Sequence, residues 1–445
     1  MDFNFINLSI ITLLLFIIND YTVRKSNLSY SSVSLIIISV VLAFNWVFTT
    51  NLFISSEWKL VFLFLVLGIY FVVIELIEDK DFDIYCLVTL VFLGSIVLIN
   101  CDNFITLYLG LELQTFSIFI LIAKNRLSIK SSEAGLKYFI LGALSSGFYL
   151  VAISVLFLTG NSLEIKEVLS LSLELIEGLC LGLIILSFCF KLSLVPLHFW
   201  IPDIYEGSSW DIITLIGTLP KISVLSILCQ VLFNTNITLS LSIASIIVGT
   251  LGSLNQTKTK RLLGYSGISH MGYIVLGFSL LNSNGLAIGT LYMVLYMFTM
   301  LSIFIAILFC LSNSEYIIEL SYLKFTNKLI AATLILLILS VAGIPPLSGF
   351  ISKWFLLWTI LDFNTSFGAL IVILFSAIGA GYYLRLVKII YFQKKSSFFL
   401  WKSVLTKREY NNETVLLFLG FLFFVNIFII ANFSFLVDLI NLNFI

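Results

Sequence analysis

The chain has 445 residues, of which 60% are hydrophobic and only 11% are charged, and its mean hydropathy is +1.12. A soluble protein would have about a quarter of its residues charged, so this composition excludes a soluble globular fold. The 24 basic and 24 acidic residues give a formal net charge of zero, which excludes the basic surface that nucleic-acid binding requires.

Long apolar runs recur from one end of the chain to the other, as in helices that satisfy their backbone hydrogen bonds inside lipid. We therefore predict an all-α polytopic membrane protein with about fourteen transmembrane helices and no soluble domain. The predicted spans are 3–18, 31–49, 58–76, 84–100, 103–123, 134–159, 175–200, 210–232, 236–254, 260–281, 285–311, 329–360, 367–393 and 415–440.

The N-terminal segment is expected to remain in the protein as a helix. The first 23 residues contain no Lys or Arg, and no small-residue cleavage site follows Phe3–Ile18. A secretory signal or a transit peptide would carry early basic charges. The first span is therefore predicted to be neither.

The six cysteines lie in or beside apolar runs and form no CxxC pair. Cysteine in such places packs as a small hydrophobic residue. No nucleotide, flavin or iron–sulfur motif occurs either. We therefore predict no metal-ligating and no cofactor-binding residues in this chain.

Basic residues predict the orientation of the helices. Of the 24 Lys and Arg, eighteen lie in odd-numbered loops, two (Lys59 and Lys166) in even-numbered loops and four inside spans. Loops rich in Lys and Arg face the negative side of a membrane. The odd-numbered loops, including Lys394–Arg408, are therefore predicted on the cytoplasmic or matrix side, and both termini on the opposite side.

The four basic residues inside spans are Lys137, Lys191, Lys221 and Lys353, and Glu112 joins them at the centre of the span 103–123. A charge at this depth costs several kcal/mol unless it faces a bundle interior or water, so such residues are functional candidates. The alternative is a paired or snorkelling charge that only fixes packing. For Lys137, one turn after an acidic residue, an i,i+4 ion pair is an equally good interpretation.

Two spans contain helix breakers, Pro196 in 175–200 and Pro345-Pro346 in 329–360. Proline removes a backbone hydrogen bond, and carbonyls freed at membrane depth need water or polar side chains as partners. We predict that both spans are discontinuous helices.

The two breaks lie five spans apart, so the helices that contain them would cross the membrane in opposite directions. This pattern is typical of inverted repeats with ion sites at discontinuous helices. We predict two inverted five-helix repeats, 84–232 and 233–395, with an N-terminal three-helix segment 1–83 and a C-terminal loop and helix 396–445. Buried lysines with a carboxylate favour proton transfer over solute binding, because a buried lysine can exchange a proton near neutral pH.

Both histidines are candidates for proton relay, although each is equally consistent with packing. His198 lies seven residues after Lys191, beside the first break, where we expect a hydrated pocket. His270 lies beside Ser266 and Ser269, which could simply form hydrogen bonds with it.

Five stretches together resemble the antiporter-like membrane subunits of respiratory complex I, and among these the chain 2 or N-type group. The stretches are LGLELQTFSIF, EAGLKYFILGALSSG, FKLSLVPLHFWIPDIYEGS, LLGYSGISHMGY and AGIPPLSGFISKW. The resemblance covers about residues 80–395, and the combination is highly specific.

The resemblance implies a proton-transfer role for seven residues: Glu112, Lys191, Lys221, Lys353, His270, Lys137 and His198. Glu112 and Lys191 match the glutamate of the family's fifth helix and the seventh-helix lysine that it pairs with. Lys221 matches the connecting lysine of the eighth helix. Lys353 matches the terminal residue of the twelfth, which is a glutamate in the M-type relatives.

The resemblance also suggests how the first break works. Pro196 would open the helix, Pro345 and Pro346 would open its counterpart, and His198 would line the pocket. We expect Pro202, Asp203 and Glu206 to end the first of these helices in the loop beyond.

The function implied is that of a non-redox, proton-translocating core subunit of NADH:ubiquinone oxidoreductase. NADH and ubiquinone would then be used by the complex, with flavin and iron–sulfur clusters in other subunits. The expected partners are other membrane-arm subunits, including neighbouring antiporter-like chains, and membrane lipid. Two alternatives remain open: an Mrp-like cation/proton antiporter subunit, and a packing subunit whose charges specify assembly.

The abundance of Phe, Ile, Asn and Ser suggests an AT-rich genome. It favours the mitochondrial inner membrane over the alternative, a bacterial plasma membrane.

Overall fold

The computed structural model describes residues 57–77, 82–125, 128–159, 164–165, 175–231, 235–280, 283–311, 315–363, 366–393 and 413–428. The first two predicted spans, Lys166, the basic segment Lys394–Arg408 and the end of the last span lie outside these residues.

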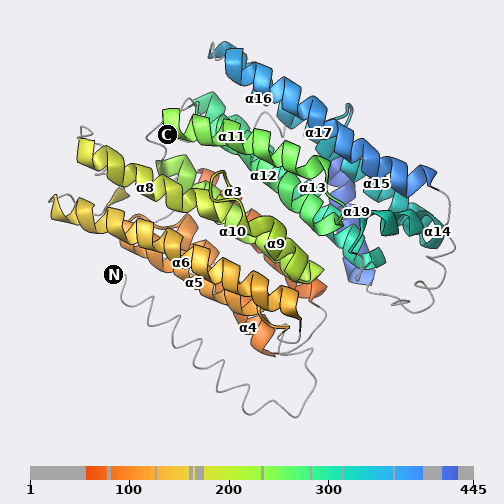
Figure 1. The fold of residues 1–445 in the computed structure, drawn as a ribbon, viewed down its shortest axis with the longest axis horizontal. Coiled ribbons are helices and arrows are strands. Elements are labelled where there is room, and N and C mark those ends of the chain that lie inside the picture. The colour runs from red at the N-terminus through yellow and green to blue at the C-terminus, as the bar shows by residue number, and fades with distance from the viewer. Residues whose placement is uncertain are drawn as a thin grey trace.

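Helices account for almost all of the described chain, and they lie side by side as a bundle (Figure 1). In chain order they are α3 (Glu57–Leu76), α4 (Phe82–Ile99), α5 (Phe104–Ile122), α6 (Ile129–Leu158), α8 (Leu175–Leu192), α9 (Trp200–Gly207), α10 (Trp210–Val231), α11 (Thr235–Leu254), α12 (Thr259–Phe278), α13 (Ser283–Leu311), the 3₁₀ helix η2 (Ile317–Tyr322), α14 (Leu323–Thr326), α15 (Lys328–Ala342), α16 (Ser348–Asp362), α17 (Ser366–Phe392) and α19 (Glu413–Phe428).

The twelve predicted spans that fall on described residues are all helical, which confirms the all-α polytopic fold. Six helices are long and apolar enough to cross a membrane on their own: α5, α6, α10, α11, α13 and α17. Shorter apolar helices, among them α8 and α15, include pieces of the interrupted spans. The order of helices before, at and after each break is the same in both halves, as the inverted-repeat prediction requires.

The two halves meet in the middle of the bundle. There α10 packs against α13, and α9 packs against α12 (Figure 1). Both α10 and α13 are almost entirely buried, with 89% and 94% of their spanning windows inside the protein. Residues on these helices are therefore shielded from lipid by the protein itself.

Both predicted helix breaks are present, and they share one geometry. Helix α8 ends at Leu192 and is followed by Ser193 with φ of 60°, and α15 ends at Ala342 and is followed by Gly343 with φ of 86°. The next residue then bonds back five positions, from Leu194 N to Cys189 O and from Ile344 N to Leu339 O. A left-handed residue with this bond is a common way to end a helix.

The predicted end of the seventh span was wrong. Pro202 does not end a helix; it lies in the first turn of α9, where its missing N–H has no helical partner to lose. Asp203 and Glu206 therefore belong to α9 rather than to a loop.

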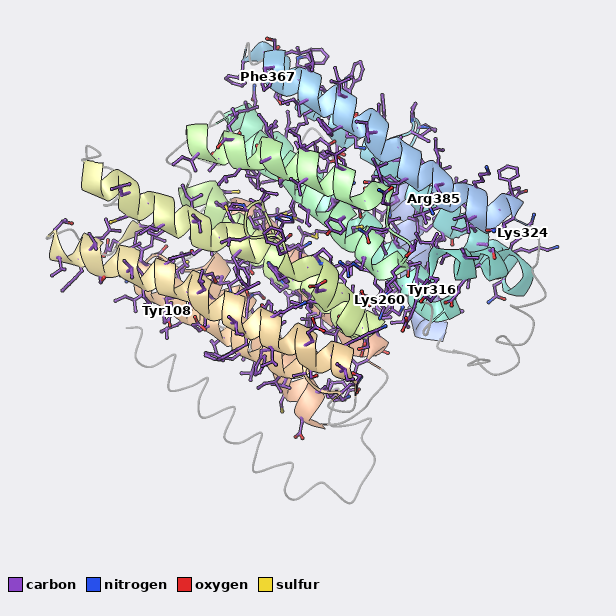
Figure 2. All side chains as sticks on the ribbon, in the orientation of Figure 1. Tyr108, Lys260, Tyr316, Lys324, Phe367 and Arg385 are labelled. Atoms are coloured by element: carbon purple, nitrogen blue, oxygen red, sulfur yellow. The ribbon has the colours of Figure 1, made fainter. Side chains whose placement is uncertain are left out.

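Contacts between loops confirm that the helices alternate in direction. Lys130 in the fifth loop pairs with Glu315 in the eleventh at 3.2 Å, and Arg261 at the ninth pairs with Glu206 at the seventh at 3.1 Å. At the opposite end Lys59 pairs with Asp102 at 3.6 Å. Figure 2 shows Lys260, Tyr316 and Lys324 at one end of the bundle and Phe367 at the other.

Candidate functional site

Three of the predicted site residues lie together in the middle of the bundle. Lys221 comes from α10, His270 from α12 and Lys353 from α16. All are buried, with Lys221 only 1% exposed. Lys221 Nζ lies beside Tyr296 and Lys353 Nζ lies 5.9 Å from the centroid of the Tyr273 ring, and both tyrosine rings pack against His270. In the sequence His270 lies 49 positions after Lys221 and 83 positions before Lys353, and the crossing of the two repeats brings the three residues to one site.

Lys221 lies against α12 at the position of Gly267. A Cβ built on Gly267 would lie 3.5 Å from both Lys221 Nζ and Tyr296 Oη. Because glycine leaves this place open, the ammonium and the hydroxyl share one small space. It lies one helical turn from His270.

His270 has a hydrogen-bond contact at each ring nitrogen. Its Nδ1 lies 3.0 Å from Tyr292 Oη, and its Nε2 lies 3.3 Å from Tyr383 Oη. Tyr296 stacks on the ring at a centroid distance of 4.9 Å. The expected hydrogen bonds with Ser266 and Ser269 are absent among the described residues, since both hydroxyls bond to carbonyls of their own helix.

Lys353 satisfies the carbonyls that the second break sets free. Its Nζ donates hydrogen bonds to Ala342 O at 2.8 Å and to Val341 O at 3.2 Å. At the first break an indole bonds to a freed carbonyl, since Trp200 Nε1 donates a hydrogen bond to Phe190 O at 2.9 Å. The freed carbonyls thus find polar side chains, as the cost of leaving them unpaired requires.

Glu112 and Lys191 lie in the first repeat, apart from the central group. Thr115 donates a hydrogen bond to Glu112 Oε2 at 3.0 Å. Glu112 is half-buried, and Lys191, in the last turn of α8, is buried. No direct ion pair joins the two within the described chain, but Glu112 is close enough for its charge to act on Lys191.

His198 lies in the turn between α8 and α9 and is buried. Its Nδ1 lies 3.3 Å from Pro196 O, and its ring packs on Phe199. His198 therefore lies outside the helix that holds Lys191, beyond the first break.

Lys137 belongs to a cluster of ion pairs at the end of the bundle. It contacts Glu133 at 2.6 Å, the predicted i,i+4 pair, and Asp203 of α9 at 2.7 Å. Arg261 of α12 contacts Asp203 at 3.4 Å and Glu206 at 3.1 Å. The cluster therefore ties α9 of the first repeat to α6 and α12.

Glu206 is the most enclosed acid of this cluster, and it lies beyond the predicted span 175–200. Burial alone would raise the pKa of its carboxyl group. Hydrogen bonds and charges from Lys258 and Arg261 outweigh burial, so the pKa lies below its ordinary value of 4.5. The carboxylate is therefore held ionised.

Several polar residues in the core were missed by sequence reasoning. Gln114 of α5 donates a hydrogen bond of 3.0 Å to Ser223 of α10, which joins two helices at membrane depth. Tyr292 and Tyr296, four residues apart in an apolar span, were visible as one face of a helix. A buried tyrosine hydroxyl usually has a partner, and this signal could have pointed to His270.

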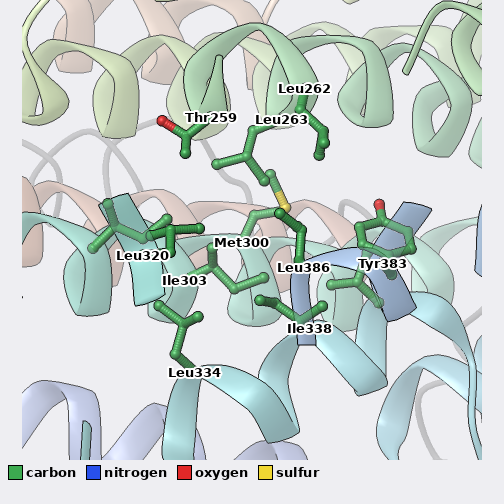
Figure 3. A pocket seen from close by; sticks show the side chains of 12 residues that line it. Thr259, Leu262, Leu263, Met300, Ile303, Leu320, Leu334, Ile338, Tyr383 and Leu386 are labelled. Atoms are coloured by element: carbon green, nitrogen blue, oxygen red, sulfur yellow. The ribbon is translucent and has the colours of Figure 1, made fainter. Parts of the chain in front are cut away.

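A small cavity lies among α12, α13, α15 and α17, between Thr259 and Tyr383 (Figure 3). Its volume is about 20 Å³, enough for about one water molecule. Its lining is almost wholly apolar, with Leu263, Met300 and Ile338 among the side chains. Apolar cavities stay dry, so this cavity offers no water-filled route for protons to Tyr383.

No group of three His, Cys, Asp or Glu side chains that could hold a metal ion occurs among the described residues. The functional groups gathered around His270 are lysine ammonium groups, an imidazole and tyrosine hydroxyls.

Fold and site together define a class: polytopic α-helical membrane proteins with two inverted repeats, broken helices and buried ionisable residues between them. Residues 101–379 match the NADH:quinone oxidoreductase/Mrp antiporter transmembrane family. The chain belongs to this family, in the group of chain 2 and subunit N of NADH:quinone oxidoreductase, or complex I.

Two relatives illustrate the similarity in sequence. NADH-ubiquinone oxidoreductase chain 2 of Metridium senile is 38% identical over 363 residues, which cover 79% of this chain and 94% of the relative. NADH-quinone oxidoreductase subunit N of Pelagibacter ubique is 32% identical over 448 residues, covering 94% and 95%.

Solved structures share the fold. A chain of respiratory complex I from Thermus thermophilus with bound aureothin has a TM-score of 0.80 at 23% identity, covering 93% of this chain and 95% of that one. A chain of the Mrp complex from Dietzia sp. DQ12-45-1b has a TM-score of 0.70 at 20% identity, covering 75% and 67%.

Proposed function

We propose that this chain is a proton-translocating core subunit of the membrane arm of NADH:ubiquinone oxidoreductase. It would carry out no redox chemistry itself. Its buried Glu, Lys and His residues would move protons across the membrane while other subunits oxidise NADH and reduce ubiquinone.

The observation that carries the proposal is the placement of two buried lysines, Lys221 and Lys353, beside tyrosines that pack against His270. A packing role would favour charges paired with carboxylates, but neither lysine has an acidic partner among the described residues. A buried lysine without an acidic partner can exchange its proton near neutral pH. Two such lysines close to one imidazole therefore suit proton transfer better than structural support.

The remaining parts of the proposal follow from this role. The chain would bind no cofactor, so flavin and iron–sulfur clusters would belong to other subunits. The half-buried Glu112 would serve the first repeat by setting the proton affinity of Lys191. The mitochondrial inner membrane is the proposed location, and a bacterial plasma membrane is the alternative.

A second candidate is a subunit of an Mrp-like cation/proton antiporter, which the shared family and the similarity to the Dietzia Mrp chain favour. The two functions predict that the chain is found in different protein complexes. A complex I subunit should co-migrate with NADH dehydrogenase activity in a blue-native gel, whereas an antiporter subunit should migrate without it.

The test is proton pumping by the assembled complex in proteoliposomes, with Lys221→Ala and His270→Ala. Each should lower coupled pumping and NADH oxidation by about tenfold, the effect of about 1.4 kcal/mol on a barrier. Lys328→Ala is the matched control, because Lys328 is exposed at the start of α15. Normal coupled turnover in both Lys221→Ala and His270→Ala would reduce these residues to structural ones.

A further inference from the structure

Hydroxyl groups contact both nitrogens of the His270 ring. Its two nitrogens are occupied by Tyr292 and Tyr383, at 3.0 and 3.3 Å. In a neutral imidazole one nitrogen donates and the other accepts. One tyrosine must therefore donate its O–H to the ring while the other accepts the ring's N–H.

On one side the hydroxyls lead towards Lys221. Tyr383 Oη lies at Nε2, and the Tyr296 ring stacks on the imidazole at a centroid distance of 4.9 Å. Tyr296 Oη in turn shares the open space at Gly267 with Lys221 Nζ. This side of the ring therefore holds Tyr383, Tyr296 and Lys221.

On the other side they lead towards Lys353. Tyr292 Oη, at Nδ1, also faces Ser352, the residue that precedes Lys353 in α16 and whose own hydroxyl donates to Gly349 O at 2.9 Å. Lys353 Nζ itself lies 5.9 Å from the centroid of the Tyr273 ring. This side therefore runs from His270 through Tyr292 to the part of α16 that carries Lys353.

We infer that Tyr292 and Tyr383 are positioning and relay residues, which orient the imidazole and pass protons between it and the two lysine sides. This inference rests on the proposed function. In one passage the ring accepts a proton at one nitrogen from the adjoining hydroxyl and releases its own proton from the other nitrogen to the second hydroxyl. The first hydroxyl regains a proton from its lysine side, and the second passes one on, so the relay groups end unchanged in charge.

A neighbouring tyrosine provides a matched control. Tyr273 is 2% exposed and packs edge-on against His270 at a centroid distance of 5.9 Å. Its hydroxyl, however, has no hydrogen-bond partner among the described residues. Tyr273→Phe therefore tests the ring cluster without touching the relay, whereas Tyr292→Phe and Tyr383→Phe each remove one contact to His270.

The experiment measures coupled proton pumping by the assembled complex in proteoliposomes, after a blue-native gel has shown assembly. Tyr292→Phe and Tyr383→Phe should each slow pumping about fivefold, the factor that corresponds to one hydrogen bond of about 1 kcal/mol. Tyr273→Phe should pump at the normal rate. In a His270→Ala background neither tyrosine change should add a loss, because residues that act through His270 couple with it.

The other outcomes separate the two proposals. Full pumping in Tyr292→Phe and Tyr383→Phe beside a defective His270→Ala would overturn the relay and leave the proposed function standing. Losses that add to that of His270→Ala, or an equal loss in Tyr273→Phe, would show a packing role instead. Should one variant not assemble, the other still tests the opposite nitrogen. Normal pumping in His270→Ala and Lys221→Ala would end both proposals.

Discussion

Lys353 of α16 donates a 2.8 Å hydrogen bond to the carbonyl oxygen of Ala342, the last residue of α15. To reach it, the side chain folds over Gly343. A Cβ on Gly343 would lie 2.9 Å from Lys353 Cδ and 3.1 Å from Nζ. The bare backbone of this glycine therefore lets a charged side chain close the end of a helix inside the membrane.

Gly343→Ala should accordingly disturb the second break. Its φ of 86° is left-handed, which costs a residue with a Cβ about 1–2 kcal/mol, and the methyl group would displace the ammonium. We expect faster hydrogen exchange at the end of α15 and reduced pumping. Gly381→Ala is the control, since nothing lies within 4 Å of a Cβ there. Equal exchange in the two variants would contradict the account.

A second prediction concerns Glu206 and pH. Because its pKa is lowered in the folded chain, the ion pairs with Lys258 and Arg261 stabilise the protein above the ordinary pKa of 4.5. This stabilisation is lost as the pH falls through the folded pKa. The difference in hydrogen exchange of α9 between the native chain and Glu206→Gln should therefore be largest near neutral pH and shrink below about pH 4.5.

The exposed acid Asp362, at the end of α16, is the control for this pH effect. Asp362→Asn should leave the exchange of α9 unchanged at every pH. A difference between native chain and Glu206→Gln that stays constant down to pH 3 would mean that Glu206 acts through packing rather than charge.

The third prediction concerns topology. Asn255, between α11 and α12, lies at the basic end of the bundle, and Asp362 lies at the other end. In a cysteine-free background, Asn255→Cys should react with an impermeant maleimide from the negative side only. Asp362→Cys should react from the positive side only. Labelling of both from one side would overturn the alternation of the helices, and exchanged sides would overturn their orientation.

Much of the fold could be predicted because its physical constraints are local. The length of an apolar run predicts where a span lies, and basic residues such as Lys130, Lys258 and Arg261 mark the ends of spans. The ends of the broken helices were harder to predict from the sequence. Pro202 was expected to stop a helix, but proline is tolerated in a first turn, and the sequence alone did not show that a new helix starts at Trp200.

The site was predictable only in part, for a similar reason. Lys221, His270 and Lys353 stand out in the sequence because an ionisable side chain in an apolar span is costly. Tyr292 and Tyr296 show only that they share one helix face, since tyrosine is common in membrane helices and its ring is apolar. Their role depends on which helices cross at His270, and that is a long-range property.

The last prediction concerns Glu112 and Lys191. Each is the most deeply placed charge of its span, and its own helix carries no oppositely charged residue within one turn. Glu112 is near enough for its charge to act on Lys191. We therefore expect the two to act as one electrostatic pair across α5 and α8.

Loss of either partner should leave the other charge uncompensated at membrane depth, which is expensive. Glu112→Gln should lower coupled activity strongly, by about tenfold, and Glu112→Asp should retain part of it. Combining Glu112→Gln with Lys191→Met should cost much less than the two single losses together, because neighbours that interact are not additive. The measurement is coupled NADH oxidation by the assembled complex. Strict additivity would show that the two charges work independently.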